Sequence, residues 1–414
     1  MSGVNSMAKM LDGVDVEWKS LGEVGKVIRG NGMQKKDFSE TGFPSIHYGQ
    51  IFTKYSLSAD KTFTYVSKEL ASKLRLANNN DLLIATTSEN DEDVLKPLAW
   101  LGKEVAISGD MMLFRSNQNV KYLAYYFQTI IFQKQKIKYI TGTKVRRISK
   151  DNLEKMIVPI PSLTIQTEII HILDNFAELT AELTAELTAE LTARKQQYNY
   201  YRDKLLSFEE GTVEYLPMGQ ENIGKFIRGS GLQKKDFTDD GVGCIHYGQI
   251  YTYYGTFTDK TKTFVSEEFA KKSRKAKSGD LIIATTSEND EDVCKAVAWL
   301  GNKDIAVSSD ACIYRHTLNS KYVAYFFQTE QFQKQKRPYI TGVKVRRVNA
   351  DNLSKILIPV PSLEKQKKIV QILDKFDTLT NSISEGLPHE IALRKQQYEY
   401  YRELLLNFPK PKGN

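Results

Sequence analysis

The sequence contains two copies of one unit, and this internal repeat constrains the fold more than any other feature. VIRGNGMQKKDF (27–38) returns as FIRGSGLQKKDF (226–237), and DLLIATTSENDEDV (81–94) returns as DLIIATTSENDEDV (280–293). The offset between matching residues is 199 early in the unit and 200 at its end, so one residue is inserted near Asn302. A chain of 414 residues built in this way predicts two like domains, each with its own core.

Each unit divides into a domain and a helix. The first part carries β-rich runs such as DLLIATT and EVAISGDMMLF, with a helix expected around KYLAYYFQTIIFQKQ, so we predict a mixed α/β domain. The second part follows PIPSL (159–163) or PVPSL (359–363), where Ser162 or Ser362 can cap a helix. The predicted segments are a first domain at 1–161, a spacer helix at 162–208, a second domain at 209–361, and a second helix with a tail at 362–414.

Apolar residues in the helical parts step by four and three, as in a coiled-coil seam. They are Ile165, Ile169, Ile172, Phe176, Leu179 and Leu183 in the first unit, and Ile369, Ile372, Phe376, Leu379 and Ile383 in the second. We predict that the first helix continues to about Ser207, roughly 69 Å of helix, and that Gly386 and Pro388 interrupt the second. The two seams are expected to pack against each other, antiparallel, as one central spacer.

The ends of the chain complete the repeat. The start, LDGVDVEWKSLG, and the end, LLLNFPKPK, together resemble the middle junction LLSFEEGTVEYLPMG. We therefore predict two tandem α/β domains in a pseudo-two-fold, nearly closed arrangement with the termini close together.

Composition limits location and chemistry. A formal net charge of +8 suits a polyanionic partner. No stretch approaches the roughly eighteen uncharged apolar residues of a membrane span, and the first residues lack a signal-peptide core, so we expect a cytoplasmic protein without a membrane partner.

The three cysteines align with other residue types in the first unit and are expected to be buried thiols that form neither disulfides nor a zinc site. The aligned pairs are Cys244 and Ser45, Cys294 and Leu95, and Cys312 and Met112.

Both domains carry the side chains that proteins use to contact DNA. Arg and Lys neutralise phosphates, and Arg, Gln and Asn match base edges in the major groove. The candidate DNA-binding residues of the first domain are Arg29, Lys35, Lys36, His47, Tyr48, Gln50, Thr86, Thr87, Ser88, Glu89, Asn90, Lys144, Arg146 and Arg147. Those of the second domain are Arg228, Lys234, Lys235, His246, Tyr247, Gln249, Thr285, Thr286, Ser287, Glu288, Asn289, Lys344, Arg346 and Arg347. The basic residues would anchor phosphates or bases, and the others are candidate base readers.

Other interpretations of these motifs stay open. TGTKVRR is also typical of an edge strand protected by charge, and IHYGQ of a buried polar cluster around a hydrogen-bonded histidine. The acidic run Asp91–Asp93 suits a helix N-terminus or a solvated loop better than a metal site. Walker, HExxH, GxSxG and CxxC motifs are absent from the sequence, which favours a binding module over an enzyme, with neither catalytic residues nor metal ligands expected.

The motifs taken together resemble one family. Two domains with TSEN and ITGTKVRRIS, each followed by an I-P-x-P turn, a QxxIVxILDxF helix and RKQQYxYYRxxLL, are similar to the specificity subunit of type I restriction-modification enzymes. The TAEL run resembles a subgroup whose central helix carries TAEL repeats. The likeness covers essentially the whole chain.

The resemblance implies a subunit that reads double-stranded DNA and leaves the chemistry to partners. Each domain would read half of a bipartite site across an unread spacer. Two modification subunits would bind S-adenosylmethionine and methylate adenine at N6, and restriction subunits would translocate and cut DNA with ATP and magnesium, while this chain binds none of these cofactors. Helix faces around Gln196–Arg202 and Gln396–Arg402 are candidates for holding the modification subunits. Family members usually carry dissimilar domains, so these near copies predict a palindromic or near-palindromic site.

The resemblance also suggests a use for the word AELT, which occurs four times at 177–192. In the family the number of such repeats sets the length of the unread spacer. One added word lengthens a helix by about 6 Å, nearly two base pairs of about 3.4 Å, and turns each Leu by about 40°. The alternative is a low-complexity helix that only aids solubility, since Ala, Glu and Leu form helices well.

Three other functions stay open at this point. They are a DNA-recognition subunit whose partner fuses methyltransferase and nuclease, an autonomous nuclease that uses Asp91–Asp93, and a coiled-coil scaffold without a DNA role. The gene of the partner would identify a fused methyltransferase-nuclease. An autonomous nuclease would cut DNA alone with magnesium, and a scaffold would show no salt-dependent DNA binding.

Overall fold

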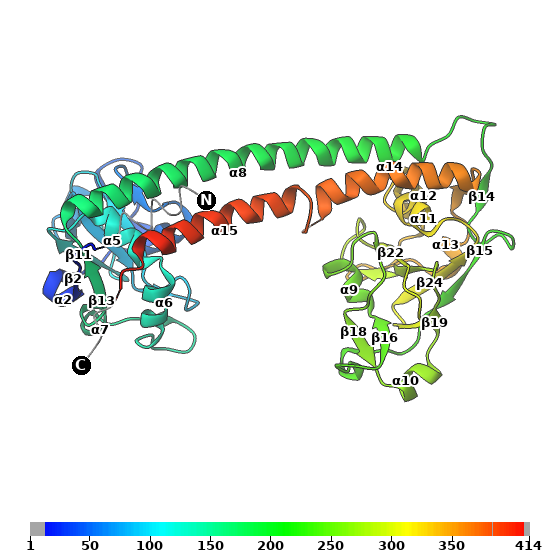
Figure 1. Cartoon of the computed structure of the whole chain (residues 1–414), viewed down its shortest axis with the longest axis horizontal. Coiled ribbons are helices and arrows are strands. Elements are labelled where there is room, and N and C mark those ends of the chain that lie inside the picture. Colours follow the sequence, from blue (N-terminus) through cyan, green and yellow to red (C-terminus); the bar gives the residue numbers. More distant parts are fainter. Residues whose placement is uncertain (1–12, 383, 410–414) are drawn as a thin grey trace. The chain divides into compact units, whose positions relative to one another are not determined.

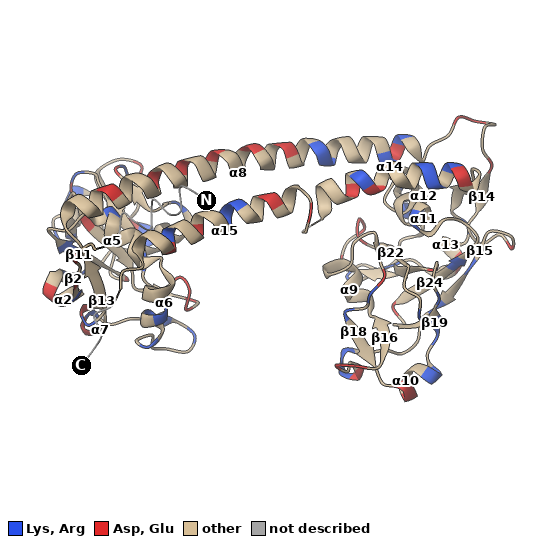
Figure 2. Cartoon of the chain, in the orientation of Figure 1, with Lys and Arg blue, Asp and Glu red and all other residues tan. Residues whose placement is uncertain are grey.

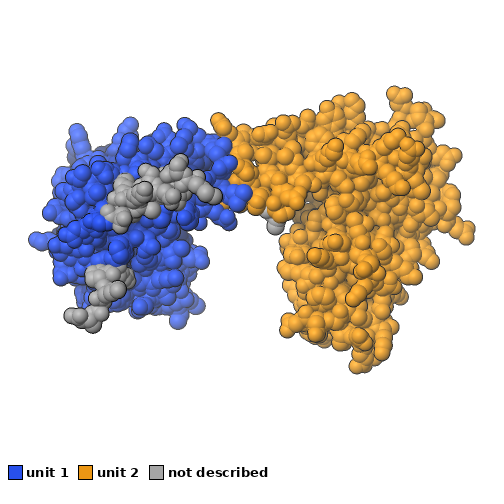
Figure 3. Space-filling view, in the orientation of Figure 1, with its two compact units in different colours: residues 1–184, 393–414 blue, residues 185–392 orange. Residues whose placement is uncertain are grey.

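A computed structural model gives the architecture of the chain, and it describes residues 13–382 and 384–409 (Figure 1). The chain forms two compact units, residues 1–184 with 393–414 and residues 185–392 (Figure 3). Each unit contains one α/β domain and parts of long helices. Among the described residues, no helix combines the length and the apolar character that crossing a membrane needs.

The first domain is built on two sheets, which confirms the predicted mixed α/β class. The five-stranded sheet has the order β2 (Gly25–Arg29), β11 (Met111–Ser116), β7 (Asp81–Ala85), β9 (Lys96–Trp100) and β4 (Ser58–Ala59). The four-stranded sheet has the order β5 (Thr64–Val66), β3 (Phe43–Ile46), β10 (Val105–Ile107) and β6 (Arg75–Ala77). Two short pairs join β1 (Glu17–Ser20) to β13 (Ile157–Ile160) and β8 (Thr87–Ser88) to β12 (Arg146–Arg147). The helices are α2 (Leu21–Val24), α3 (Tyr48–Thr53), α4 (Lys68–Ala71), α5 (Val120–Phe127), α6 (Ile130–Ile137), α7 (Lys150–Glu154) and the 3-10 turn η1 (Lys35–Asp37).

The second domain repeats this topology strand for strand. Its five-stranded sheet has the order β15 (Gly224–Arg228), β24 (Ala311–His316), β20 (Leu281–Ala284), β22 (Ala296–Trp299) and β17 (Phe257–Thr258). Its four-stranded sheet has the order β18 (Thr263–Val265), β16 (Val242–Ile245), β23 (Ile305–Val307) and β19 (Lys275–Ala276). The short pairs are β14 (Tyr215–Pro217) with β26 (Leu357–Pro359), and β21 (Thr286–Ser287) with β25 (Arg346–Arg347). Its helices are α9 (Tyr247–Thr252), α10 (Glu267–Lys272), α11 (Ser320–Phe326), α12 (Glu330–Lys336), α13 (Ala350–Leu353) and the 3-10 turns η2 (Lys234–Asp236) and η3 (Arg337–Tyr339).

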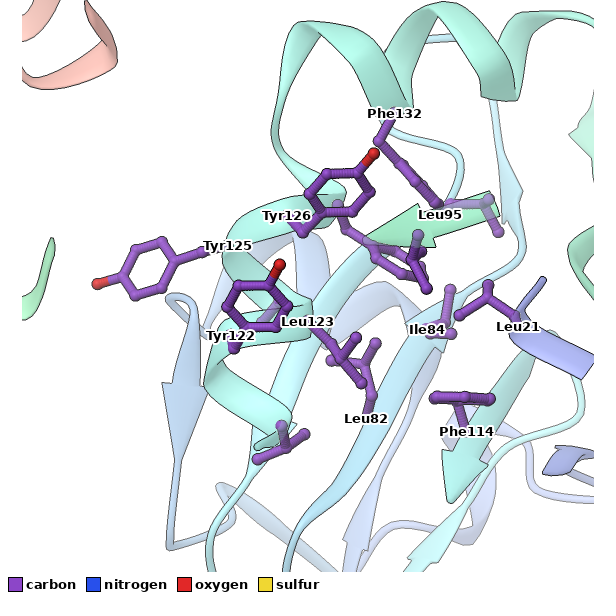
Figure 4. Close-up of a cluster of buried hydrophobic side chains, with 14 of the residues drawn as sticks. Leu21, Leu82, Ile84, Leu95, Phe114, Tyr122, Leu123, Tyr125, Tyr126 and Phe132 are labelled. Carbon is purple, nitrogen blue, oxygen red and sulfur yellow. The ribbon is translucent and has the colours of Figure 1, made fainter. Parts of the chain in front are cut away.

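The central strand β7 is buried along its whole length, and its side chains alternate between two cores. Leu82 and Ile84 lie in a core with the side chains of α5 (Figure 4). Leu83 and Ala85 lie in a second core, with apolar residues of the four-stranded sheet. An uninterrupted apolar run such as DLLIA is what a strand covered on both faces requires.

The long helices are α8 (Leu163–Leu205), α14 (Leu363–Asn381) and α15 (Leu387–Leu406). The predicted interruption of the second helix is confirmed at Gly386, because α14 ends before it and α15 begins after it. Pro388 does not interrupt the helix, because it is the second residue of α15, where the first turn tolerates proline. A Cβ atom on Gly386 would lie 2.3 Å from the carbonyl oxygen of Thr378, so only glycine fits this break.

The helices complete the core of each domain. In the first unit Ile169, Ile170 and Leu173 of α8 join the core with Leu405 and Leu406 of α15. The Phe176 ring stacks on Tyr401 at 4.8 Å between centroids. In the second unit the equivalent rings, Phe376 and Tyr201, stack at 5.7 Å.

The predicted coiled-coil register was wrong at three positions. Leu179 is 61% exposed, Ile372 43% and Leu379 36%, while Ile383 lies outside the described residues. Each helix must cover its α/β domain as well as the second helix, which widens the buried stripe toward residues such as Ile170 and Thr380. A four-residue repeat is slightly longer than one helical turn, so equivalent residues of successive AELT repeats move around α8 and do not stay on the buried side. The Glu residues of the repeats form acidic bands along α8 (Figure 2).

A half-buried polar contact joins each domain to its helix. Tyr125 of α5 points away from the apolar cluster (Figure 4), and its hydroxyl donates to Asp174 of α8 at 2.8 Å. Lys121 pairs with the same carboxylate. Tyr325 and Lys321 repeat the arrangement with Asp374 at 2.7 and 2.8 Å.

The predicted role of the cysteines is confirmed. Cys244, Cys294 and Cys312 are free thiols with exposed fractions of 2% or less. Burial raises the pKa of the Cys294 and Cys312 thiols to about 12, so they stay protonated and act as small apolar side chains.

His316 makes the second unit sensitive to acid. Burial lowers the pKa of His316 to about 4, although the carboxylate of Asp280 opposes this shift. The unfolded chain takes up the proton near pH 6.5, whereas the folded chain does so only near pH 4. The free energy of unfolding is therefore highest above pH 6.5 and falls as the pH drops toward 4.

We expect the wild type to lose roughly 2 kcal/mol of unfolding free energy through His316 between pH 7 and pH 5. The variant His316→Ser, which copies Ser116 of the first repeat, should not show this loss. Urea unfolding of both proteins at the two pH values checks this; an equal loss in both would contradict it.

Candidate nucleic-acid interface

Two of the predicted motifs meet in space. The short strands β8 and β12 pair antiparallel, which sets Arg146 opposite Ser88 and Arg147 opposite Thr87. The second domain repeats the pairing through β21 and β25. The TTSEN segment and the basic TGTKVRR segment, far apart in the sequence, therefore form one surface in each domain.

The basic segment is a tight hairpin. Thr141 and Arg147 exchange two backbone hydrogen bonds of 2.9 Å. Gly142 has φ +93°, and a Cβ atom there would lie 2.1 Å from the carbonyl oxygen of Val145. The turn therefore requires glycine, and it leaves Lys144 exposed at the tip.

The two arginines of the hairpin differ in their use. Arg146 pairs with Asp91 at 2.9 Å and also donates to the carbonyl of Gly142, so its charge holds the loop together. Arg147 is exposed. A phosphate contact is thus better assigned to Arg147 than to Arg146, and the same holds for Arg347 and Arg346.

Three of the predicted residues, Arg29, Thr86 and Thr87, bond to Asp110 or to its neighbour Gly109. The hydroxyl of Thr86 donates to the Asp110 carbonyl at 3.2 Å, and the hydroxyl of Thr87 to its carboxylate at 3.3 Å. Arg29 donates to the neighbouring carbonyl of Gly109. In the second domain the equivalent residues line one hollow of about 390 Å³: Arg228, Thr285, Thr286, Asp310 and Arg347.

His47 and Gln50 fit the buried polar cluster rather than base reading. The ring nitrogen Nδ1 of His47 accepts from the Gly49 N–H at 3.2 Å, and Oε1 of Gln50 accepts from the His47 N–H at 2.9 Å. These contacts cap α3, and both side chains are 7% exposed. Burial lowers the pKa of His47, and the nearby charge of Lys35 lowers it further, so the ring is neutral at neutral pH.

The predicted DNA-binding residues fall into three groups by the exposure of their side chains. Exposed residues available to a partner are Arg29, Lys35, Lys36, Glu89, Asn90, Lys144 and Arg147, with Arg228, Lys234, Lys235, Glu288, Asn289, Lys344 and Arg347 in the second domain. Half-buried are Tyr48, Ser88 and Arg146, with His246, Tyr247, Gln249, Thr285, Ser287 and Arg346. Buried are His47, Gln50, Thr86, Thr87 and Thr286. The exposed set is mostly basic, as contact with a phosphate backbone requires.

The acidic run after TTSEN has partners inside its own loop. Asp91 pairs with Arg146, and Asp93 accepts from the Asn90 amide at 2.8 Å. In the part of the chain that the structure describes, no three acidic, His or Cys side chains are grouped to hold a metal ion. The loop interpretation of Asp91–Asp93 thus fits the geometry better than the metal interpretation.

Sequence reasoning missed the residues that hold this surface in place. Asp110 and Asp310 end the repeated motifs SGD (108–110) and SSD (308–310), and Ser108 accepts from the Tyr48 N–H at 2.9 Å. Comparison of the two repeats could have flagged them as shared polar residues. Their role as supports depends on contacts between distant segments, which spacing does not reveal.

The helix faces proposed to hold modification subunits are only partly free. Tyr198 is buried, and Tyr201 stacks on Phe376 inside the second unit. Tyr200 and Tyr400 remain 59% and 56% exposed. The exposed tyrosines are the part of these segments that a partner could contact.

Comparison with known proteins places the chain in a family. The type I restriction modification DNA specificity domain matches residues 13–193 and 218–393. The chain belongs to this family. The type I restriction enzyme EcoR124I/EcoR124II specificity subunit of Escherichia coli is 33% identical, over 99% of each protein. A putative type I restriction enzyme specificity subunit of Haemophilus influenzae is 30% identical, over 97% of this chain and 98% of that protein. The resemblance to type I specificity subunits is confirmed, and the TAEL subgroup stays a prediction.

Solved type I structures share the fold. A chain from a structure on assembly and conformational transition of a type I restriction-modification system has a TM-score of 0.68 at 14% identity and covers 95% of this chain and 98% of its own length. The HsdS subunit from Thermoanaerobacter tengcongensis has a TM-score of 0.55 at 14% identity and covers 94% of this chain and 95% of its own. The two tandem domains with long helices are thus the architecture of type I specificity subunits.

Arg147 provides a test of the surface. A side chain that neutralises one phosphate contributes about 0.9 to the slope of log affinity against log salt concentration. We expect Arg147→Ala to lower the magnitude of that slope by about this amount, measured by fluorescence anisotropy on duplex DNA at several salt concentrations. Arg194→Ala removes an equal charge from α8 and should leave the slope unchanged. An unchanged slope for Arg147→Ala would exclude the phosphate contact.

Proposed function

We propose that the chain is the DNA-reading subunit of a type I restriction-modification complex, in which each domain reads one half of a bipartite site. The observation that carries this proposal is the surface built twice from TTSEN and the basic hairpin, in a member of the specificity family. Exposed Arg and Lys side chains would hold phosphates, and Ser88 to Asn90 would reach base edges.

We propose that the chemistry belongs to partners. Two modification subunits would bind S-adenosylmethionine and methylate adenine at N6, and restriction subunits would use ATP and magnesium. The chain itself would bind double-stranded DNA and these subunits, and none of the cofactors. The loop around Asp91–Asp93 supports this division, because the carboxylates of Asp91 and Asp93 are engaged by Arg146 and Asn90.

The two half-sites are proposed to be inverted copies of one sequence. The exposed candidate residues are the same amino acids at matching places in both domains. Like domains placed about a two-fold axis read inverted half-sites.

Methylome sequencing tests the reader and its symmetry together. Cells that express this chain with its modification subunit should gain an N6-methyladenine motif with inverted, matching halves and a fixed spacer. Cells with the modification subunit alone are the control. A strongly asymmetric motif would reject the matching half-sites, and a lack of any new motif with both proteins folded would reject the proposed function.

The AELT words are proposed to set the spacer. Deletion of residues 181–184 shortens α8 by about 6 Å, so the unread spacer in the methylated motif should shorten by one base pair, and at most by about two. The same methylome measurement checks this. Glu182→Gln with Glu186→Gln keeps the length and removes charge, and should leave the spacer unchanged. If the deletion leaves the spacer length unchanged, this would support the alternative of a helix that only aids solubility.

A further inference from the structure

Each domain contains a fully buried lysine that DNA reading does not use directly. Lys136, at the end of α6, is 1% exposed, and Lys336, at the end of α12, is 0% exposed. Lysines are almost never fully buried unless their charge is compensated. Two copies of so costly a feature call for a physical role.

Both lysines bind the backbone of the same turn. The Lys136 ammonium donates to the carbonyls of Glu92 at 2.8 Å and Val94 at 2.9 Å. Lys336 donates to Glu291 at 3.0 Å and Val293 at 2.8 Å. This turn follows the Ser-Glu-Asn segment in each domain, so the lysine holds the end of that loop.

The charge of the lysine is compensated locally. Burial lowers the pKa of Lys136 to about 8, while the carboxylates of Asp93, Asp91 and Glu92 oppose the shift. Lys136 is therefore charged at neutral pH. The acidic run thus favours the charged form of a buried lysine.

The turn needs support because its backbone is strained. Leu95 has φ 63°, and Cys294 at the same place has φ 72°. This left-handed conformation is one that residues with a side chain avoid. The Leu95 N–H donates to Ala85 at 2.8 Å, which closes the loop onto the end of β7.

The opposite side of the loop is held as well. Asn90 and Asp93 bond to each other, and Asp91 pairs with Arg146 of the hairpin. The β8 pairing fixes Thr87 and Ser88, and Lys136 fixes the residues that follow Asn90. Within the segment the Glu89 side chain is exposed to a partner, while the exposed Asn90 amide also bonds to Asp93.

We propose that Lys136 and Lys336 are positioning residues for sequence recognition, each setting the conformation of the reading loop in its own domain without touching DNA. This inference rests on the proposed function. It goes further because it makes the accuracy with which each domain recognises its half-site depend on one buried ammonium group.

The test uses the whole chain with its modification subunit and compares Lys136→Met, Lys336→Met and the double variant. Methionine keeps the apolar length and removes the donor. Lys134→Met, on the same helix but exposed, removes an equal charge and is the matched control. Methylome sequencing reads the motif, and binding to specific and random duplexes at several salt concentrations reads affinity.

We expect each single variant to relax one half of the motif, so that every methylated site keeps one intact half, and the double variant to relax both. The ratio of specific to random binding should fall by roughly tenfold. The salt slope should stay that of the wild type, because a buried ammonium neutralises no phosphate. Lys134→Met should behave as the wild type.

An unchanged motif in both single variants would overturn the proposal. So would equal relaxation of both halves by one variant, or loss of all methylation through unfolding, since either would assign the lysine to overall stability. If the wild-type chain yields no motif, the proposed function fails rather than this inference.

Discussion

The burial of β7 on both faces is the constraint on which each domain depends. A strand covered by α5 on one side and by the four-stranded sheet on the other cannot shift its register, because a one-residue slip would exchange its two sets of apolar side chains. The loop that begins at Thr86 leaves this strand directly. The Ser88–Asn90 segment, in which Glu89 and Asn90 are exposed, thus follows a strand that is buried along its whole length.

The polar residues around that loop divide into supports and contacts. Asp110, Arg146 and Lys136 hold backbone and side chains in place, whereas Arg147 and Lys144 stay exposed. Such supports satisfy hydrogen-bonding groups that would otherwise be buried without partners. The exposed residues of this surface therefore rest on a set of polar residues whose side chains bond within the domain.

The two repeats act as natural controls for one another. Places where both keep the same residue, such as Lys136 and Lys336, mark shared structure. Places where they differ, such as Ser116 and His316, mark properties of one unit only. Each unit also takes helix residues from distant parts of the chain, since Leu405 and Leu406 complete the core of the first domain.

The repeat, the mixed α/β domains, the buried cysteines and the helix break at Gly386 were predictable, because each depends on local composition or on comparison of the two copies. The seam register was not: Leu179 and Ile372 fit the heptad but are exposed, because the helices also cover the domains. Nor could spacing separate Arg147 from Arg146, or the capping residues His47 and Gln50 from exposed candidates. The sequence by itself determined which residue types are available and that they occur twice. Tertiary structure alone decided which of them face outward, because pairing between distant segments, such as β8 with β12, uses up some polar groups and leaves others exposed.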